Sequence, residues 1–161
     1  MSDEVTKVAL ITGACGGIGK ALVYKYVSQG VSLAIADKSL KEVELLVDEV
    51  VSMGGTAKAF SGDLTEQSYC DNLPNDVKKE FGRIDILVNN AGLMRRGAIT
   101  DTTDEDYNLS MSVNVEAPFR IVRAAIPLME ASGGGAIVNT SSCWGINPGP
   151  NHLIYCTTKA A

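Results

Sequence analysis

The chain alternates short apolar, β-branched runs with longer segments whose apolar residues recur at helical spacing, and this alternation limits the possible fold most strongly. The runs expected to be strands cover residues 7–12, 31–37, 56–60, 83–92 and 133–142. Strands that alternate with helices predict right-handed βαβ units and a parallel sheet. A length of 161 residues suits one domain. We therefore expect a single doubly wound α/β domain over residues 1–161.

The segments between the expected strands carry helix signals. One helix is expected from Ile18 to Gly30, and another from about Thr65. Ser39 is a candidate N-cap for a helix with the apolar stripe Leu40, Val43, Val47 and Val50. A long helical stretch after the fourth strand has Pro118 and Pro127 as expected bends, and its expected apolar stripe is Val115, Phe119, Val122, Ile126 and Met129.

Charge and composition exclude several classes of function. The net charge is −5 with only 14 basic residues, which offers no basic surface for nucleic acid or an anionic membrane. The N-terminus is acidic where a signal peptide would be basic, and no apolar run is long enough to span a bilayer. The four cysteines and single histidine show no metal-ligand spacing or disulfide framework. We expect a cytoplasmic protein without a metal.

A glycine-rich turn, TGACGGIG, stands between the first expected strand and its helix. Gly13, Gly17 and Gly19 would permit a tight turn and a close approach of the backbone to a phosphate. The helix that follows would offer free N–H groups and a partial positive charge to a pyrophosphate. A turn of this kind at a strand–helix junction predicts a dinucleotide site, although an incidental tight turn is the alternative.

Two carboxylates follow at the ends of the next two expected strands. Asp37 suits the ribose hydroxyls of a dinucleotide and would repel a 2′-phosphate, which favours NAD over NADP, while the adjacent Lys38 weakens that preference. Asp63 in GDLT could bind an adenine edge, or Asp63 or Thr65 could cap the next helix.

Tyr155 and Lys159 stand four residues apart near the end of the chain and would share one face of a helix. A cation beside a phenol stabilises the phenolate that proton transfer requires. Taken alone, the pair fits a catalytic function or a solvated helix surface equally well.

Five patterns occur in chain order: TGACGGIG, NNAG (89–92), SVNV (112–115), IVNTSS (137–142) and YCTTK (155–159). Together they resemble the short-chain dehydrogenase/reductase family over nearly the whole chain. The resemblance implies a Rossmann-like sheet of strand order 3-2-1-4-5 and hydride transfer between NAD(H) and a secondary alcohol or ketone. It also implies a homo-oligomer, dimer or tetramer, for the full-length form.

The resemblance also implies a role for individual residues. Tyr155 would be the acid/base, Lys159 its electrostatic partner and a ribose ligand, Ser142 the hydroxyl that orients the substrate oxygen, and Asn114 the holder of a water linking Lys159 to solvent. Ser142 is preferred to Ser141 because it lies 13 residues before Tyr155, the family's separation. The implied cofactor residues are Gly13, Cys15, Gly17, Ile18, Gly19, Asp37, Asp63, Leu64, Asn90, Ala91, Gly92, Tyr155 and Lys159.

The chain departs from the family after the Tyr-x-x-x-Lys pair, because family members continue well beyond it and this chain ends at Ala161. We expect the fifth strand to be an open sheet edge. We also expect the helix that carries the pair to have about two turns and little intrinsic stability. A second hypothesis is therefore a catalytically inactive dinucleotide-binding fragment or regulatory module.

The substrate is only weakly encoded. Arg95 or Arg96 in MRRG could meet an anionic substrate or belong to a solvated loop. Trp144 and the GPNHLI segment (149–154), which includes His152, could line the substrate pocket or serve as loop scaffolding.

Overall fold

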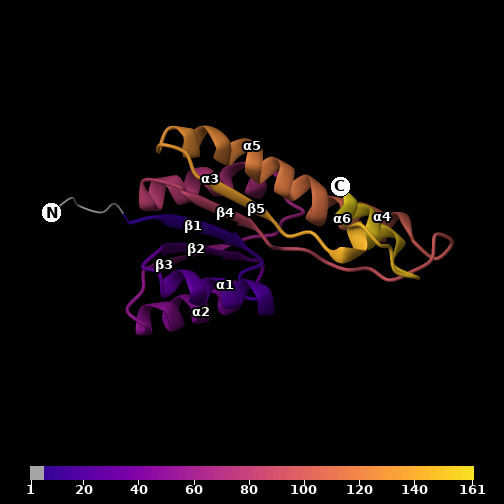
Figure 1. Cartoon of the computed structure of the whole chain (residues 1–161), viewed down its shortest axis with the longest axis horizontal. Coiled ribbons are helices and arrows are strands. Elements are labelled where there is room, and N and C mark those ends of the chain that lie inside the picture. The colour runs from indigo at the N-terminus through magenta and orange to yellow at the C-terminus, as the bar shows by residue number, and fades with distance from the viewer. Residues whose placement is uncertain (1–5) are drawn as a thin grey trace.

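A computed structural model describes residues 6–161, which form a five-stranded parallel sheet with helices on both faces (Figure 1). The strands are β1 (Val8–Thr12), β2 (Ser32–Asp37), β3 (Ala57–Ser61), β4 (Ile86–Asn89) and β5 (Ala136–Asn139). The helices are α1 (Gly17–Val27), α2 (Leu40–Ser52), α3 (Gln67–Phe81), α4 (Asp104–Met111), α5 (Ala117–Glu130) and α6 (Leu153–Ala160), with a π-helical turn η1 (Ser112–Glu116) and a 3-10 turn η2 (Cys143–Gly145). The acidic residues 1–5, used above against a signal peptide, lie outside the described residues.

The strand order is β3-β2-β1-β4-β5, which confirms the expected doubly wound sheet. Helices α1 and α2 cover one face, and α3 and α5 cover the other (Figure 1). The central strand β1 is buried along its whole length. Its residues alternate between the two cores: Ala9 and Ile11 belong to the core under α1 and α2, and Leu10 to the core under α3 and α5. No helix among residues 6–161 combines the length and apolarity needed to cross a bilayer.

Helix α2 begins where the sequence predicts and buries a slightly different stripe. The Ser39 hydroxyl accepts a hydrogen bond from the Glu42 N–H at 3.4 Å, as an N-cap does. Val43 and Val50 are buried as expected, together with Leu46. Leu40 is instead 53% exposed. It is the first helical residue, and side chains on a helix tilt toward its N-terminus, which carries this one past the packed face.

Helix α5 buries a face that the sequence analysis predicted only in part: Met129 is buried as expected, and Val122 packs against the core. Ala117, Ile121, Ala125 and Met129 are buried, whereas Phe119 is 63% and Ile126 41% exposed, so the expected stripe was wrong at these two positions. The turn η1 immediately before α5 is π-helical, and its extra residue per turn changes which residues of α5 face the sheet. The small side chains of Ala117 and Ala125 allow α5 to lie close to α3. Pro118 stands in the first helical turn, where a missing N–H is tolerated.

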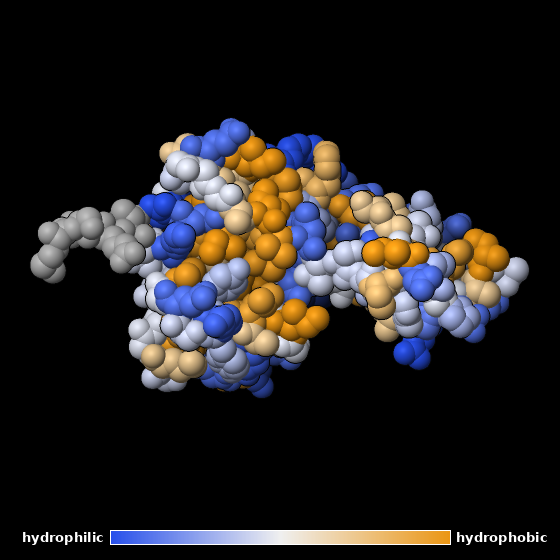
Figure 2. Space-filling model, in the orientation of Figure 1, coloured by the Kyte–Doolittle hydropathy of each residue, from blue (hydrophilic) through white to orange (hydrophobic). Residues whose placement is uncertain are grey.

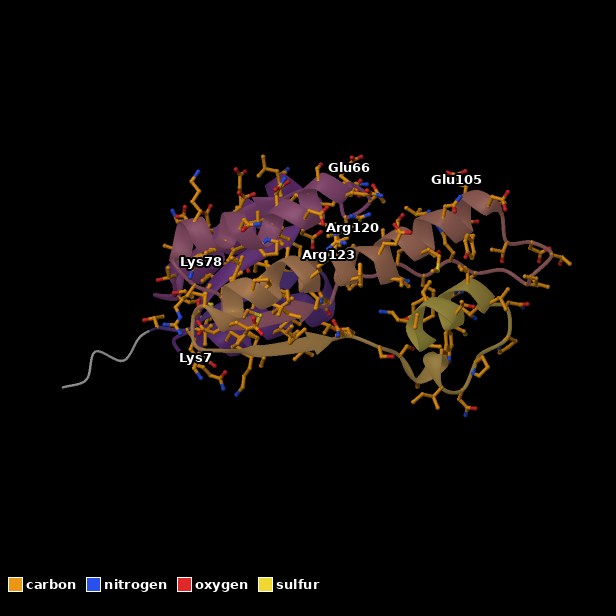
Figure 3. The ribbon with its side chains drawn as sticks, turned by 90° about the horizontal axis from the view of Figure 1, so that it is seen from above. Lys7, Glu66, Lys78, Glu105, Arg120 and Arg123 are labelled. Carbon is orange, nitrogen blue, oxygen red and sulfur yellow. The ribbon has the colours of Figure 1, made fainter. Side chains whose placement is uncertain are left out.

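Ion pairs join α5 to α3 along their outer surface. Arg120 and Arg123, labelled on α5 in Figure 3, contact the two carboxylate oxygens of Asp71 on α3 at 3.2 and 3.0 Å. Both arginines are partly exposed, so these pairs orient the helices more than they stabilise them.

The carboxyl end of the sheet supports a second group of elements. In Figure 1, α4 and α6 lie beyond the ends of β4 and β5, away from the N-terminal end of β1. Among the described residues, strand β5 lies at one edge of the sheet and pairs with β4. Val138 on β5 is 49% exposed, and Figure 2 shows apolar side chains at the surface on this side of the molecule. Tyr155 and Lys159, two of the expected site residues, lie on α6 in this group.

Candidate active site

The glycine turn between β1 and α1 is closed by two glycines that have no room for a side chain. Gly13 has a φ of 61°, and a Cβ atom on it would lie 2.6 Å from the Cα of Ala91. A Cβ atom on Gly19 would overlap the carbonyl oxygen of Gly13. Gly17 opens α1 and faces open space. The turn therefore presents the amino end of α1, whose first N–H groups lack helical partners, to any anionic ligand.

A groove of about 770 Å³ runs along the carboxyl ends of the strands. Its walls contain most of the expected cofactor residues: Gly13, Cys15, Gly17, Ile18, Asp37, Asp63, Leu64, Asn90, Ala91 and Gly92. Gly19 packs beneath the turn, and Tyr155 and Lys159 stand on α6 outside the groove walls. Residues from four strand ends thus meet at the edge where open α/β sheets bind ligands.

Asp37 ends β2 and joins the groove wall to the glycine turn. Its carboxylate accepts hydrogen bonds from the N–H of Cys15 at 2.9 Å and of Lys38 at 2.7 Å. A carboxylate has about four acceptor positions, so two remain for a ribose diol. Burial and the nearby Asp37 carboxylate raise the pKa of the Cys15 thiol to about 11. Cys15 is therefore a neutral thiol in the groove near neutral pH.

An ion pair connects the ends of β2 and β3 across the groove wall. Lys38 Nζ lies 2.7 Å from Oδ2 of Asp63. The other carboxylate oxygen of Asp63 accepts hydrogen bonds from the N–H and hydroxyl of Thr65, both at 2.9 Å. The contact with Lys38, and to a smaller extent the hydrogen bonds from Thr65, lower the pKa of the Asp63 carboxyl to about 2. Neither Asp63 nor Thr65 caps α3, because the N-cap residue is Glu66, so the capping alternative was wrong.

The loop after β4 is tied to the glycine turn through Asn90. Its side-chain amide donates to the carbonyl oxygens of Thr12 at 3.2 Å and Gly13 at 2.9 Å. The Thr12 hydroxyl accepts from the backbone N–H groups of Asn90 and Ala91, each at 3.2 Å. The sequence analysis did not identify Thr12, although a hydroxyl at the end of the first strand was the available signal. These bonds fix the width of the groove between β1 and β4.

Asn114 lies in the π-helical turn η1 and closes the far side of the same loop. Its Oδ1 accepts from the Leu93 N–H at 2.9 Å, and its Nδ2 donates to the Leu93 carbonyl at 2.9 Å. The second Nδ2 hydrogen is donated to the Thr158 hydroxyl at 2.9 Å. Both N–H groups of the side chain are thus engaged, so any water held by Asn114 would have to bind one of its oxygen atoms. Thr158 is the second functional candidate that the sequence analysis missed.

Tyr155 and Lys159 lie on α6, one turn apart. Lys159 Nζ is 5.9 Å from the centre of the Tyr155 ring and donates to the Thr140 carbonyl at 2.7 Å. A Cβ atom on Gly92 would lie 3.3 Å from Lys159 Nζ and 3.3 Å from Asn114 Oδ1, so the groove loop, η1 and α6 meet at this point. Burial lowers the pKa of the Lys159 ammonium.

The two serines after β5 have different partners. Ser141 donates its hydroxyl to the Lys159 carbonyl at 2.8 Å, which anchors the end of α6. The Ser142 hydroxyl accepts from the Trp144 N–H at 3.2 Å, and its proton has no partner among the described residues. Trp144 packs edge-on to Tyr155, with ring centres 6.1 Å apart. This arrangement is compatible with the expected preference for Ser142.

The two arginines of MRRG differ in position. Both arginines are exposed. Arg95 lines the groove, and its Nε lies 3.0 Å from Oδ1 of Asp106 on α4, whereas Arg96 lies outside the groove walls. The loop then joins the start of α6, because Gly97 N–H donates to the Asn151 carbonyl at 2.9 Å. Part of the GPNHLI segment lines a second cavity, separate from the groove. This cavity of about 460 Å³ is lined by Trp144, Gly149, Asn151 and Leu153 among others, and Tyr155 is not one of its lining residues.

Three features now stand together: a parallel sheet of order 3-2-1-4-5, a glycine turn that opens a groove at its carboxyl edge, and a helix with the Tyr–Lys pair beside that groove. They define a Rossmann-like, dinucleotide-binding class of protein. A comparison with protein families identifies the family. Residues 7–161 match the model described as short chain dehydrogenase, and the chain belongs to that family.

Several known proteins are similar to this chain over almost all of its length. An uncharacterized oxidoreductase of Thermotoga maritima is 40% identical over 155 residues, which cover 96% of this chain and 61% of the relative. Two solved structures superpose closely on this chain. NAD+-bound xylitol dehydrogenase is 31% identical with a TM-score of 0.92, and the match covers 98% of this chain and 62% of that protein. L-sorbose reductase from Gluconobacter frateurii, in complex with NADPH and L-sorbose, is 30% identical with a TM-score of 0.93, and the match covers 96% of this chain and 59% of that protein. The chain therefore spans about three fifths of the length of these relatives. The names of these relatives are those of an oxidoreductase, a dehydrogenase and a reductase.

Proposed function

We propose that the protein transfers hydride between NAD(H) and a secondary alcohol or its ketone. The observation that carries this proposal is the junction at Gly92 in the groove loop, where an added Cβ atom would lie 3.3 Å from both Lys159 Nζ and Asn114 Oδ1. It joins a groove suited to a dinucleotide to the helix that carries the Tyr–Lys pair. Similarity to a xylitol dehydrogenase and an L-sorbose reductase supports a hydroxylated substrate.

The groove residues fit a dinucleotide. The open face of Gly17 leaves space at the amino end of α1 for a pyrophosphate, whereas the closed positions Gly13 and Gly19 form the turn. Asp37 has free acceptor positions for the adenosine ribose, and Asp63 and Leu64 line the groove near the end of β3. When bound, the nicotinamide supplies or accepts the hydride. We assign the ribose next to it to Lys159, which has donors beyond the one bonded to Thr140.

The proton is the part of the reaction that we assign to this chain. In alcohol oxidation, the substrate C–H bond breaks with its electron pair leaving as hydride, and the O–H proton passes to the phenolate oxygen of Tyr155. In ketone reduction, Tyr155 returns the proton. Lys159 stabilises the phenolate because its ammonium lies on the same side of α6. The Ser142 hydroxyl, whose proton is free, would donate to the substrate oxygen.

We propose NAD rather than NADP as the preferred cofactor. The Asp37 carboxylate faces the groove at the end of β2 and would repel a 2′-phosphate. The nearby cation Lys38 is held by Asp63 and so does not neutralise Asp37. The similar structures include one bound to NAD+ and one bound to NADPH, so the preference depends on these residues of this chain.

We also propose that the full protein is a homo-oligomer. Phe119 and Ile126 form an exposed apolar stripe on α5, where a stable monomer would more often place polar residues. Light scattering of the purified protein would show its mass, and a monomer at all concentrations would contradict this assignment.

The proposed reaction is tested with Tyr155→Phe. Replacing the phenol by a phenyl ring removes the proton donor without changing the groove, so turnover of polyols or hydroxy acids with NAD+ should fall by about a hundredfold to ten-thousandfold. The fluorescence titration with NADH should still show saturable binding. Exposed Tyr107→Phe on α4 is the matched control and should leave both quantities as in the wild type. Undiminished turnover by Tyr155→Phe would remove Tyr155 from the proposed role, and absence of saturable NADH binding would remove the cofactor assignment.

A further inference from the structure

Thr158 lies on α6 between the two side chains assigned to catalysis, and it is 3% exposed. Its hydroxyl donates to the carbonyl oxygen of Tyr155, one turn earlier, at 2.9 Å. The neighbouring Thr157 makes a similar bond within the helix, to the Leu153 carbonyl at 3.0 Å, but its side chain is exposed. Unlike Thr157, the buried Thr158 hydroxyl takes part in a second hydrogen bond, to a residue outside α6.

The same Thr158 oxygen accepts a hydrogen bond from Nδ2 of Asn114 at 2.9 Å. A hydroxyl has a single proton, and a carbonyl can only accept, so the direction of both bonds is fixed. The Asn114 amide donates to the Thr158 hydroxyl, which donates to the Tyr155 carbonyl. No other arrangement of protons satisfies all three groups.

Asn114 continues this chain of hydrogen bonds to the groove. Its remaining polar atoms pair with the N–H and carbonyl of Leu93, both at 2.9 Å. Leu93 lines the groove and follows Gly92, the residue packed against Lys159. A continuous path of hydrogen bonds therefore links the groove loop, the π-helical turn η1 and the backbone of Tyr155.

We propose that Thr158 is a positioning residue that sets the orientation of α6, and thereby of Tyr155, relative to the groove loop at Leu93. The inference rests on the proposed function of Tyr155. Helix α6 packs against η2, α4 and η1, so its orientation is set by contacts outside the helix. The bond between Thr158 and Asn114 is a buried polar contact that ties α6 to the rest of the fold. A catalytic group displaced by about 1 Å loses about a hundredfold in rate, so this tie matters for chemistry more than for binding.

Thr158→Val tests the proposal, because valine keeps the branched shape and removes the hydroxyl. We expect kcat to fall by about tenfold or more, with the NADH dissociation constant and the KM for the alcohol changed by less than about twofold. Thr158→Ser, which retains the hydroxyl, should recover most of the lost rate. Thr157→Val is the matched control: it removes a hydroxyl from the same helix without touching Asn114, and should behave as the wild type.

A second readout does not depend on turnover. Trp144 is the single tryptophan, with its ring centre 4.1 Å from that of His152 and 6.1 Å from that of Tyr155, so its fluorescence reports the position of α6. Thr158→Val should change the emission maximum of Trp144, whereas Thr157→Val and Thr158→Ser should not. Asn114→Ala should reproduce the change, and adding Thr158→Val to it should have little further effect because both residues act in one network.

The outcomes separate this inference from the proposed function. If Thr158→Val matches Thr157→Val in Trp144 emission and in kcat, Thr158 does not position the helix. If the wild type binds NADH but oxidises no alcohol, the proposed function fails, and Trp144 emission still decides the role of Thr158. Should valine disturb folding in far-ultraviolet circular dichroism, Thr158→Ala supplies the same comparison with a smaller side chain.

Discussion

Replacing Asp37 with serine tests the preference for NAD at the residue that we hold responsible for it. A 2′-phosphate on the adenosine ribose would lie roughly 5 Å from this carboxylate, where two unit charges repel by about 3 kcal/mol at an effective dielectric constant of about 20. Screening in an open groove reduces this repulsion to about 1–2 kcal/mol. Since each 1.4 kcal/mol corresponds to about a factor of ten, Asp37→Ser should strengthen NADPH binding by about tenfold.

The same substitution should weaken NADH. It removes one or two acceptors for the ribose hydroxyls, worth about 1 kcal/mol each, so NADH should bind about tenfold more weakly and the ratio of the two affinities should change by about a hundredfold. A serine hydroxyl can still accept from the Cys15 N–H, which preserves the turn.

Fluorescence titrations with NADH and NADPH at one ionic strength measure both dissociation constants. Asp48→Ser is the matched control, because Asp48 is an exposed carboxylate on α2 that does not line the groove. Equal changes in the two dissociation constants for Asp37→Ser would refute the electrostatic argument.

Two further predictions concern stability. Ile121→Ala opens a cavity in the core between α3 and α5 and should lower the free energy of unfolding in urea by about 2–5 kcal/mol. Phe119→Ala, on the exposed face of the same helix, should lower it by less than about 1 kcal/mol. Equal losses for the two variants would place both side chains in the core. The pKa of Asp63, lowered to about 2 by Lys38 and then by Thr65, lies below the unfolded value of about 3.9, so this carboxylate stabilises the fold above about pH 4 and loses its contribution as the pH falls toward 2. Asp63→Asn should therefore flatten the pH dependence of urea unfolding between those values, and an unchanged slope would contradict the ion pair.

The sheet and the glycine turn could be predicted because their requirements are local. Gly13 adopts a positive φ and Gly19 leaves no space for a Cβ atom, so the sequence must carry glycine at both positions. Asp37 could also be located, since it ends a strand whose apolar pattern is unmistakable. The carboxyl ends of parallel strands meet at one edge, which brings these residues together without any further information.

The face of α5 could not be predicted from helical spacing. Phe119 and Ile126 fit a helical stripe on the expected face, and Ile121 and Ala125 fit one equally well on the observed face. Apolarity alone favours burial of the face with the larger side chains. Two conditions decided the outcome: the π-helical turn before α5 changes the phase of the helix, and small residues allow close packing against α3. Both depend on tertiary structure rather than on periodicity.

The helix that carries the Tyr–Lys pair is held in place by its neighbours. The sequence analysis expected little intrinsic stability for this helix. Its last turn is instead fixed by the Ser141 hydroxyl on the Lys159 carbonyl, and a Cβ atom on Gly145 would overlap that same carbonyl. Thr158 adds a second tie through Asn114. Because these partners come from the loop after β5 and from η1, the geometry of the Tyr–Lys pair is set by the surrounding fold.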